Sequence, residues 1–323
     1  VGCIPRSKIG VPALNFQAGI IPFDCTTDTW QSWLTQDGPD LVTPTGYSAS
    51  HQIISLLMRS NGNFVLAFQG GTLLGDCSYS IFNGSSWSAV VTVEVGLLAI
   101  HAPAATAIDS TDRVYFFYPD TPGGLFVLQA RMLGKSLSSS NVLSSQFTVM
   151  DDVQSNQPLC GQAVVFTEGG TEKIGIVYSR GVFYPIPYFH ITKTITGQSY
   201  FATAAIGATP TFTSVPINFQ NPNSSSGSNI GSDLVFAPDP SANLAALWLS
   251  GLKTFNVIAN RRTAGAWQTV NTVAWNSLYA DPTLYAVVSE LQGRYLTSRG
   301  KIGFIHVMDL QSGTSPIIVY NEV

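Results

Sequence analysis

The segment Lys173-Ile-Gly-Ile-Val-Tyr178 decides the fold, because Lys301-Ile-Gly-Phe-Ile-His306 repeats it near the end of the chain. Three further segments have the same form, a polar residue followed by a short apolar run: Asn63–Phe68, Arg113–Tyr118 and Asn243–Trp248. The five apolar runs start at Phe64, Val114, Ile174, Leu244 and Ile302, at intervals of 50, 60, 70 and 58 residues. Self-similarity at such intervals is typical of repeat folds in which each copy is one structural unit.

Each copy is predicted to be the second strand of a four-stranded antiparallel sheet. In the first unit, Asn-Gly turns typical of hairpins separate the strand-like segments Ile53–Arg59, Phe64–Gln69, Asp76–Phe82 and Trp87–Val93. The sequence therefore predicts an all-β fold, a β-propeller of five blades, with a β-sandwich as the alternative. Because second strands are covered on both faces, we expect five side chains to be buried. They are Val65, Phe116, Ile176, Ala246 and Phe304.

The fifth unit is short of one strand, since only Tyr285–Leu291, Ile302–Met308 and Ile317–Tyr320 are strand-like. Propellers usually close by pairing the two ends of the chain, which leaves no free sheet edge. We therefore predict that Thr29–Gln36 pairs with Ile317–Tyr320. Residues 29–323 would then form a single propeller domain, and residues 1–28 an extended arm that prolines keep out of a sheet. The alternative is a six-bladed ring, in which Lys8–Phe23 builds strands of its own.

Composition excludes several classes of function. Charged residues are 11% of the 323 residues, and the net charge is −4. A nucleic-acid partner needs a basic face that neutralises phosphates, so we expect none. The nearest approach to a membrane-spanning helix, Val95–Ile108, is shorter than the roughly 20 residues required and contains His101 and Pro103, so we expect no membrane insertion. The four cysteines lack the spacing of a metal site, and we expect no cofactor.

The segment Ser80-Ile-Phe-Asn-Gly-Ser-Ser-Trp87 resembles the Asp-box of sialidase-like propellers, written S-x-D-x-G-x-x-W. It falls at the predicted turn between a third and a fourth strand, which is where that family has it. Phe82 stands where the family has Asp. The resemblance implies a propeller of the sialidase-like or propeller-lectin type. A sialidase would also need an arginine triad, a Tyr/Glu pair and a Phe-Arg-Ile-Pro motif, and that motif is absent from the sequence.

Two groups of residues are candidates for a binding site. In propellers the first strand of each blade lines a central channel, and the residues before these strands converge at one mouth. Here those residues are His51, His101, Gln157, Asp233 and Asp281. Two imidazoles and two carboxylates suit a cation or a polyol, the alternative being hydrogen-bonded strand ends. In the segment Phe183–Phe189, Tyr184 and Tyr188 offer stacking surfaces to a sugar, with core filling as the alternative.

Recognition is the predicted function rather than catalysis. A glycosidase needs two carboxyl groups about 5 to 10 Å apart. Five-bladed glycosidases that resemble this architecture take their acids mostly from the first three blades, where this chain has His51, His101 and Gln157. We therefore expect a glycan- or receptor-binding module on a virion, phage tail or other extracellular assembly, with the arm as the contact to other subunits or components. The alternatives are a secreted lectin-like propeller acting alone and a glycoside hydrolase that uses Asp233 and Asp281.

Overall fold

The structure is a computed structural model of the chain. It describes residues 2–7, 15–24, 27, 29–34, 40–42, 53–69, 77–94, 105–120, 130–152, 159–184, 193–217, 235–238, 244–250, 256–268, 272–276, 286–296, 299–310 and 317–322. Every helix or strand among these residues is a β-strand, which confirms the all-β prediction.

Three four-stranded antiparallel sheets occupy the middle of the chain, and each is built from consecutive strands. The first contains β6 (Ile53–Met58), β7 (Phe64–Gln69), β8 (Cys77–Phe82) and β9 (Val91–Glu94). The second contains β10 (Ala105–Ile108), β11 (Val114–Asp120), β12 (Ala130–Leu137) and β13 (Phe147–Asp152). The third contains β14 (Leu159–Glu168), β15 (Thr171–Tyr184), β16 (Lys193–Ala205) and β17 (Thr213–Ile217). The predicted four-stranded unit is thus confirmed in these sheets.

The remaining sheets lie toward the two ends of the chain. One contains β18 (Val235–Pro238), β19 (Leu244–Ser250) and β20 (Asn256–Thr263), with β21 (Ala266–Trp267) and β22 (Thr272–Asn276) both paired to β20. The last contains β23 (Ala286–Leu296), β24 (Lys301–Leu310) and β25 (Ile317–Glu322). Near the N-terminus, β1 (Gly2–Ser7), β2 (Asn15–Ile21) and β5 (Asp40–Val42) form a sheet, and β3 (Phe23–Asp24) pairs with β4 (Thr29–Trp30).

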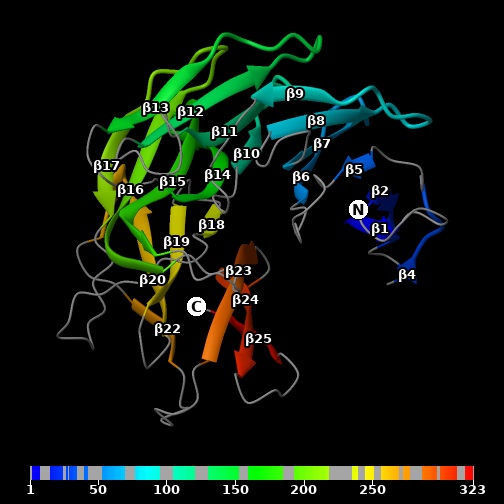
Figure 1. The fold of residues 1–323 in the computed structure, drawn as a ribbon. Helices are drawn as coiled ribbons and strands as arrows, with labels where there is room; N and C mark the ends of the chain where they lie inside the picture. Colours follow the sequence, from blue (N-terminus) through cyan, green and yellow to red (C-terminus); the bar gives the residue numbers. More distant parts are fainter. Residues whose placement is uncertain are drawn as a thin grey trace.

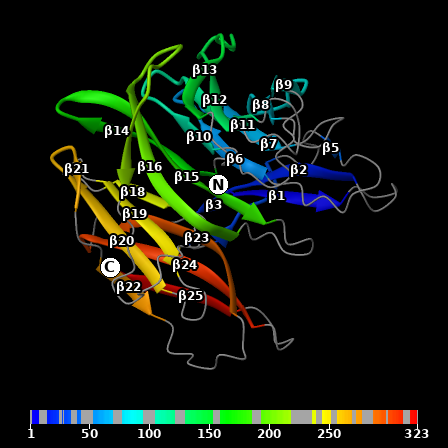
Figure 2. The same ribbon diagram turned by 60° about the vertical axis from the view of Figure 1, so that its left-hand side comes forward.

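The sheets follow one another in chain order around an arc (Figures 1 and 2). The first strand of each sheet contacts the first strand of the next, in the series β1, β6, β10, β14, β18 and β23. First strands therefore line the inside of the arc, and later strands lie toward its outside. This radial arrangement is that of a β-propeller, as the sequence predicts. The described residues contain six sheets with three or more strands.

The predicted closure of the last sheet is wrong. Instead of pairing with β25, the segment Thr29–Leu34 runs back along the end of β2 and along β3. Trp30 pairs with Phe23, and the Leu34 amide donates to the Ile20 carbonyl at 2.8 Å. Among the described residues, β25 pairs with β24 alone. A tight local turn costs far less loop entropy than joining the two ends of the chain, so the near partner is preferred.

The segment before residue 29 also differs from the extended arm that we predict. β1 and β2 pair in register from Gly2 with Ile21 to Ser7 with Phe16, so prolines do not keep this segment out of a sheet. Pro5 is tolerated because β1 is an edge strand, whose outward backbone needs no donor. These strands follow the alternative in which Lys8–Phe23 contributes to a sheet of its own. The domain boundary between residues 28 and 29 stays a prediction.

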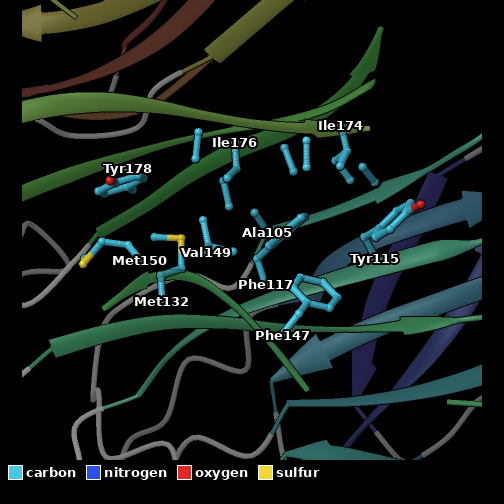
Figure 3. Packing of buried hydrophobic residues seen from close by; sticks show 14 residues of the cluster. Ala105, Tyr115, Phe117, Met132, Phe147, Val149, Met150, Ile174, Ile176 and Tyr178 are labelled. Carbon is cyan, nitrogen blue, oxygen red and sulfur yellow. The ribbon is translucent and has the colours of Figure 1, made fainter. Parts of the chain in front are cut away.

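The core lies between neighbouring sheets rather than within one. Figure 3 shows the cluster between the β10–β13 and β14–β17 sheets, where Phe117 and Phe147 meet edge to face across 6.1 Å near Ile174. A second cluster joins the β6–β9 and β10–β13 sheets. Four of the five predicted core residues are confirmed as buried, at 0 to 1% exposure: Val65, Phe116, Ile176 and Phe304. The side chain of Ala246 lies outside the described residues.

The turn that resembles an Asp-box adopts a compact hydrogen-bonded form between β8 and β9. The side-chain oxygen of Asn83 accepts hydrogen bonds from the amides of Ser85 and Ser86 at 3.0 and 2.9 Å. Gly84 has a φ of +96°, in the left-handed region that a side chain disfavours. The Trp87 ring then packs on Phe82 at 5.2 Å. The turn thus fixes where the outermost strand starts.

The same turn recurs where the sequence gives little sign of it. The Ser88 amide donates to the Ile81 carbonyl and the Ser144 amide to the Ser136 carbonyl, both at 2.7 Å. The hydroxyls of the two serines accept from the amides of the same partner residues, Ile81 and Ser136. The same backbone hydrogen bonds therefore occur in two sheets, although the sequence that resembles an Asp-box was found in only one of them.

Candidate functional site

One end of the arc is closed by short turns, and we call it the turn face. It carries the turns at residues 59–63, 109–113 and 169–170, which join first to second strands. The first two turns share one hydrogen-bond pattern: the Arg59 amide donates to the Asn63 carbonyl as the Asp109 amide does to the Arg113 carbonyl. Repeated sequence thus produces repeated turns.

A serine in each of these two turns binds a carboxylate of the next sheet. Ser60 donates its amide to Asp112 Oδ1 at 2.8 Å and its hydroxyl to Asp112 Oδ2 at 2.5 Å. Ser110 repeats this with Glu172, at 3.2 Å from the amide and 2.6 Å from the hydroxyl. Hydrogen bonds from Ser60 hold the pKa of Asp112 below its ordinary value. We call these two contacts the serine clasps.

Arg59 adds a buried cation to the first clasp. Only 2% of its surface is exposed, and it reaches the β12–β13 turn of the next sheet. Its guanidinium donates to Asn141 Oδ1 at 2.6 Å and to the carbonyls of Ser138 and Ser139 at 2.9 and 3.3 Å. Burial lowers the pKa of Arg59. The group stays charged at neutral pH because the guanidinium is a very strong base.

Polar contacts continue around the turn face to later sheets. Tyr115 of β11 accepts a hydrogen bond from the Gly207 amide at 2.9 Å and donates to Asp109 at 2.9 Å. Glu168, at the end of β14, forms ion pairs with Lys173 and with Arg262 of β20. Burial alone would raise the pKa of Glu168, but the hydrogen bonds from these two cations outweigh it and the pKa lies below its ordinary value. Hydrogen bonds and ion pairs therefore join neighbouring sheets at the turn face, from the β6–β9 sheet to β20.

The opposite end of the arc, which we call the link face, follows from this geometry. The first strands of neighbouring sheets contact one another, and each starts at this end. From β6 onward, first and third strands start at this end, and second strands end there. The residues that join these strand ends lie outside the described residues. In repeated folds the longer connections on one face are the usual place for binding residues.

The predicted channel residues all precede a strand that starts at the link face. Each first strand of the five predicted units is present, starting at Ile53, Ala105, Leu159, Val235 and Ala286. The residues themselves, His51, His101, Gln157, Asp233 and Asp281, lie outside the described residues. Their gathering into one site stays a prediction. Among the residues that the structure describes, no group of three His, Cys, Asp or Glu side chains is placed to hold a metal ion.

A two-stranded ribbon extends the β14–β17 sheet at the link face. Within the described part of the chain, the pairing of β14 with β15 reaches Leu159 opposite Ser179. Beyond that point β15 and β16 continue to pair with each other, from Arg180 opposite Gln198 to Tyr184 opposite Lys193. The ribbon therefore passes the start of β14, where Gln157 is two residues away in sequence. We expect Phe183–Phe189 to avoid a central strand, and this holds only in part because β15 runs to Tyr184. The side chain of Tyr184 and all of Tyr188 lie outside the described residues.

The serine clasps are the residues that sequence reasoning missed. Ser60 and Ser110 look like ordinary turn formers, and Asp112 and Glu172 like solvated charges. A signal was available, since each acid directly precedes the polar residue that opens a repeated segment, Arg113 or Lys173. No helix of the described chain is long and apolar enough to cross a membrane.

The arc of antiparallel sheets with first strands inside defines a β-propeller. No known protein-family model and no curated protein sequence matches the chain. Solved structures do match it in fold. An ulvan lyase, from a polysaccharide lyase family, aligns with a TM-score of 0.53 at 12% identity, covering 96% of this chain and 72% of that one. An α-L-arabinofuranosidase from Fusarium graminearum aligns with a TM-score of 0.51 at 12% identity, covering 99% of this chain and 91% of that one.

Proposed function

We propose that the chain is a glycan-recognition module that binds its ligand at the link face. The observation that carries this proposal is the difference between the two ends of the ring. Serine clasps and Arg59 lock the turn face, whereas the link face has the starts of β6, β10, β14, β18 and β23 and the β15–β16 ribbon. A rigid frame that presents variable segments at one end is a common basis for recognition.

The ligand class is supported by the fold relatives and by composition. The ulvan lyase and the arabinofuranosidase with this fold both act on saccharides, as their names say. The link-face residues that we propose as ligands are His51, His101, Gln157, Asp233, Asp281, Tyr184 and Tyr188. Imidazole, amide and carboxylate groups hydrogen-bond to sugar hydroxyls, and tyrosine rings stack on sugar rings.

We further propose that the module works in an extracellular assembly such as a virion or phage tail. Its low charge, 11% of residues, and its many neutral polar residues suit a surface exposed outside a cell. An assembly role for residues 1–28 stays a prediction. Ile20 packs in a cluster with Phe64 and Phe82 of the same chain, so an assembly contact would use other residues of this segment.

The second candidate function is glycoside hydrolysis by Asp233 and Asp281. It has one specific observation in its favour: β18 and β23, the strands that follow these residues, contact each other. Asp233 and Asp281 thus precede neighbouring first strands in the sequence. A separation of about 5 to 10 Å would allow one to act as acid and the other as base or nucleophile. A secreted lectin that acts alone is the remaining alternative.

A glycan-array screen of the full chain, followed by product analysis on every glycan bound, tests the proposal. We expect binding without cleavage, with affinity reduced at least about tenfold in a Tyr184→Ala variant and in the double variant Asp233→Asn, Asp281→Asn. Ser140→Ala, on the turn face, is the matched control and should bind normally. Cleavage that disappears in the double variant would favour the hydrolase. Full binding in both link-face variants would overturn the proposed site.

A further inference from the structure

An aromatic residue recurs at one position on the third strand of three sheets. Tyr79, Phe201 and Tyr320 lie opposite equivalent residues of the second strands, Ala67, Val177 and Ile305. In two sheets the next sheet covers this ring. Tyr79 is 4% exposed and stacks on Phe116 at 5.6 Å, and Phe201 is 0% exposed and meets Trp267 edge-on at 5.4 Å.

Tyr320 differs, because 54% of its surface is exposed. The ring lies across Gly303 of β24, where an added Cβ would come within 3.0 Å of the Tyr320 hydroxyl oxygen and 3.3 Å of its Cε2. Because Gly303 has no side chain, the Tyr320 ring can pack directly on the sheet. The Tyr320 ring therefore packs against β24 on one side and presents an aromatic surface to solvent on the other.

Two cations lie near Glu322, the carboxylate that binds the Tyr320 hydroxyl, and one of them, Arg299, is held by it. Glu322 Oε1 accepts a hydrogen bond from the Tyr320 hydroxyl at 2.7 Å and forms an ion pair with Arg299. The Glu322 side chain is only 16% exposed, whereas Arg299 is 63% exposed. Lys301 is also exposed and within electrostatic reach of Glu322. Among the described residues, the accessible charge near Tyr320 is therefore positive, on a chain whose net charge is −4.

The ionisation states fit binding rather than nucleophilic chemistry. The hydrogen bond to Glu322 raises the pKa of Tyr320, so its hydroxyl stays protonated at neutral pH and acts as a donor. The hydrogen bond from Tyr320, with the charges of Arg299 and Lys301, lowers the pKa of Glu322, so its carboxylate stays ionised.

We propose that Tyr320, Arg299 and Lys301 form a binding site for an acidic sugar, one that carries a carboxylate or sulfate. The sugar ring stacks on the exposed face of Tyr320, and its anionic group binds the exposed cations. Glu322 is the positioning residue that orients Arg299 and the Tyr320 hydroxyl. The site lies on the last strand of the last sheet, at the end of β25 nearer the turn face, and it does not depend on binding at the link face.

Two model ligands that differ in one group provide the test. Methyl β-D-glucuronide and methyl β-D-glucoside have the same ring and differ by a carboxylate in place of a hydroxymethyl. In titrations of the full chain followed by NMR, we expect the glucuronide to bind about fivefold tighter at low salt. That preference should disappear at about 0.5 M salt, where exposed charges are screened.

Variants assign the effect to the side chains. Tyr320→Ala should weaken both sugars about tenfold, and Tyr320→Phe should retain most of the affinity because the ring remains. Arg299→Ala with Lys301→Ala should remove only the preference for the glucuronide. Arg261→Ala, an exposed arginine of β20, is the control and should change nothing.

Three results would overturn this site: equal affinity for the two sugars, normal binding by Tyr320→Ala, or self-association that covers Tyr320 and is lost in Tyr320→Ala. The link-face double variant Asp233→Asn, Asp281→Asn separates the two proposals. It should leave glucuronide binding unchanged. If it alone abolishes all sugar binding, the link-face site stands and the Tyr320 site is wrong.

Discussion

Gly175 shows how tightly the seams between sheets are packed. An ideal Cβ at this position would lie 2.6 Å from Cε2 and Cζ of Phe201 and 3.0 Å from Cε1 of Phe166. Phe201 has no room to retreat, because Trp267 meets its ring and the Arg262 guanidinium lies 5.2 Å from the ring centre. The second glycine of the repeated Lys-Ile-Gly segment, Gly303, lies in the same way beneath Tyr320. Glycine at this repeat position therefore makes space for an aromatic ring.

Gly175→Ala should lower the free energy of unfolding by about 1 to 3 kcal/mol through overpacking. Gly207→Ala is the matched control, since an added Cβ there meets nothing within 4 Å, and it should change stability by less than about 0.5 kcal/mol. Urea unfolding of both variants checks this. Equal stability of the two would show that Phe201 is free to move.

Arg59→Ala should cost about 2 to 4 kcal/mol of unfolding free energy. The substitution removes a buried side chain and its charged hydrogen bonds to Asn141 and to the carbonyls of Ser138 and Ser139. Arg59→Lys should restore only part of the loss, because a single ammonium cannot reach three acceptors in a fork. Arg261→Ala, which removes an exposed arginine, is the control. If it lowered the free energy of unfolding as much as Arg59→Ala does, the burial of Arg59 would not explain the loss.

At the scale of elements, the clasp between Ser60 and Asp112 makes the contact between two sheets depend on pH. The pKa of Asp112 is lowered in the folded chain, so its contribution to stability is present above its unfolded pKa of about 3.9 and is lost as the pH falls through the lower folded value. The stability difference between the parent and Asp112→Asn should therefore be largest near pH 6 and shrink toward pH 3. Urea unfolding at both pH values measures it. A difference that grows in acid would contradict the clasp.

Strands and turns differ in how far sequence predicts them. The second strands were predictable because each has a polar start and an apolar run, and their burial follows from covering both faces. The pairing of Thr29–Leu34 was not predictable, because the same apolar pattern suits a near partner and a distant one. Loop entropy decides between the two partners. The serine clasps were missed although each acid holds the same place before a repeated segment, because a hydroxyl in a turn does not show which carboxylate lies opposite it. For the site, sequence places five residues before first strands, and the structure supplies the strands that they precede.

At the scale of the molecule, the N-terminal sheet is held to the ring by a small cluster. Ile20 is fully buried beside Phe64 and Phe82. Ile20→Ala should cost about 2 to 4 kcal/mol of unfolding free energy if this sheet unfolds together with the ring. Val142→Ala, at a side chain that is 65% exposed, should change it by less than about 0.5 kcal/mol. A loss that appears only in a separate early transition would mean that the N-terminal sheet unfolds independently.

Among the described residues, each of the larger sheets is built from one continuous stretch of chain, so its strand pairings join segments of that same stretch. Such a chain has little loop entropy to lose before its first contacts form, so folding should start within single sheets and proceed from neighbour to neighbour. During synthesis, the β6–β9 hairpins can form before the strands of the last sheet have been made. The slowest step should then be the docking of completed sheets along their aromatic seams, which are the contacts that join distant parts of the sequence.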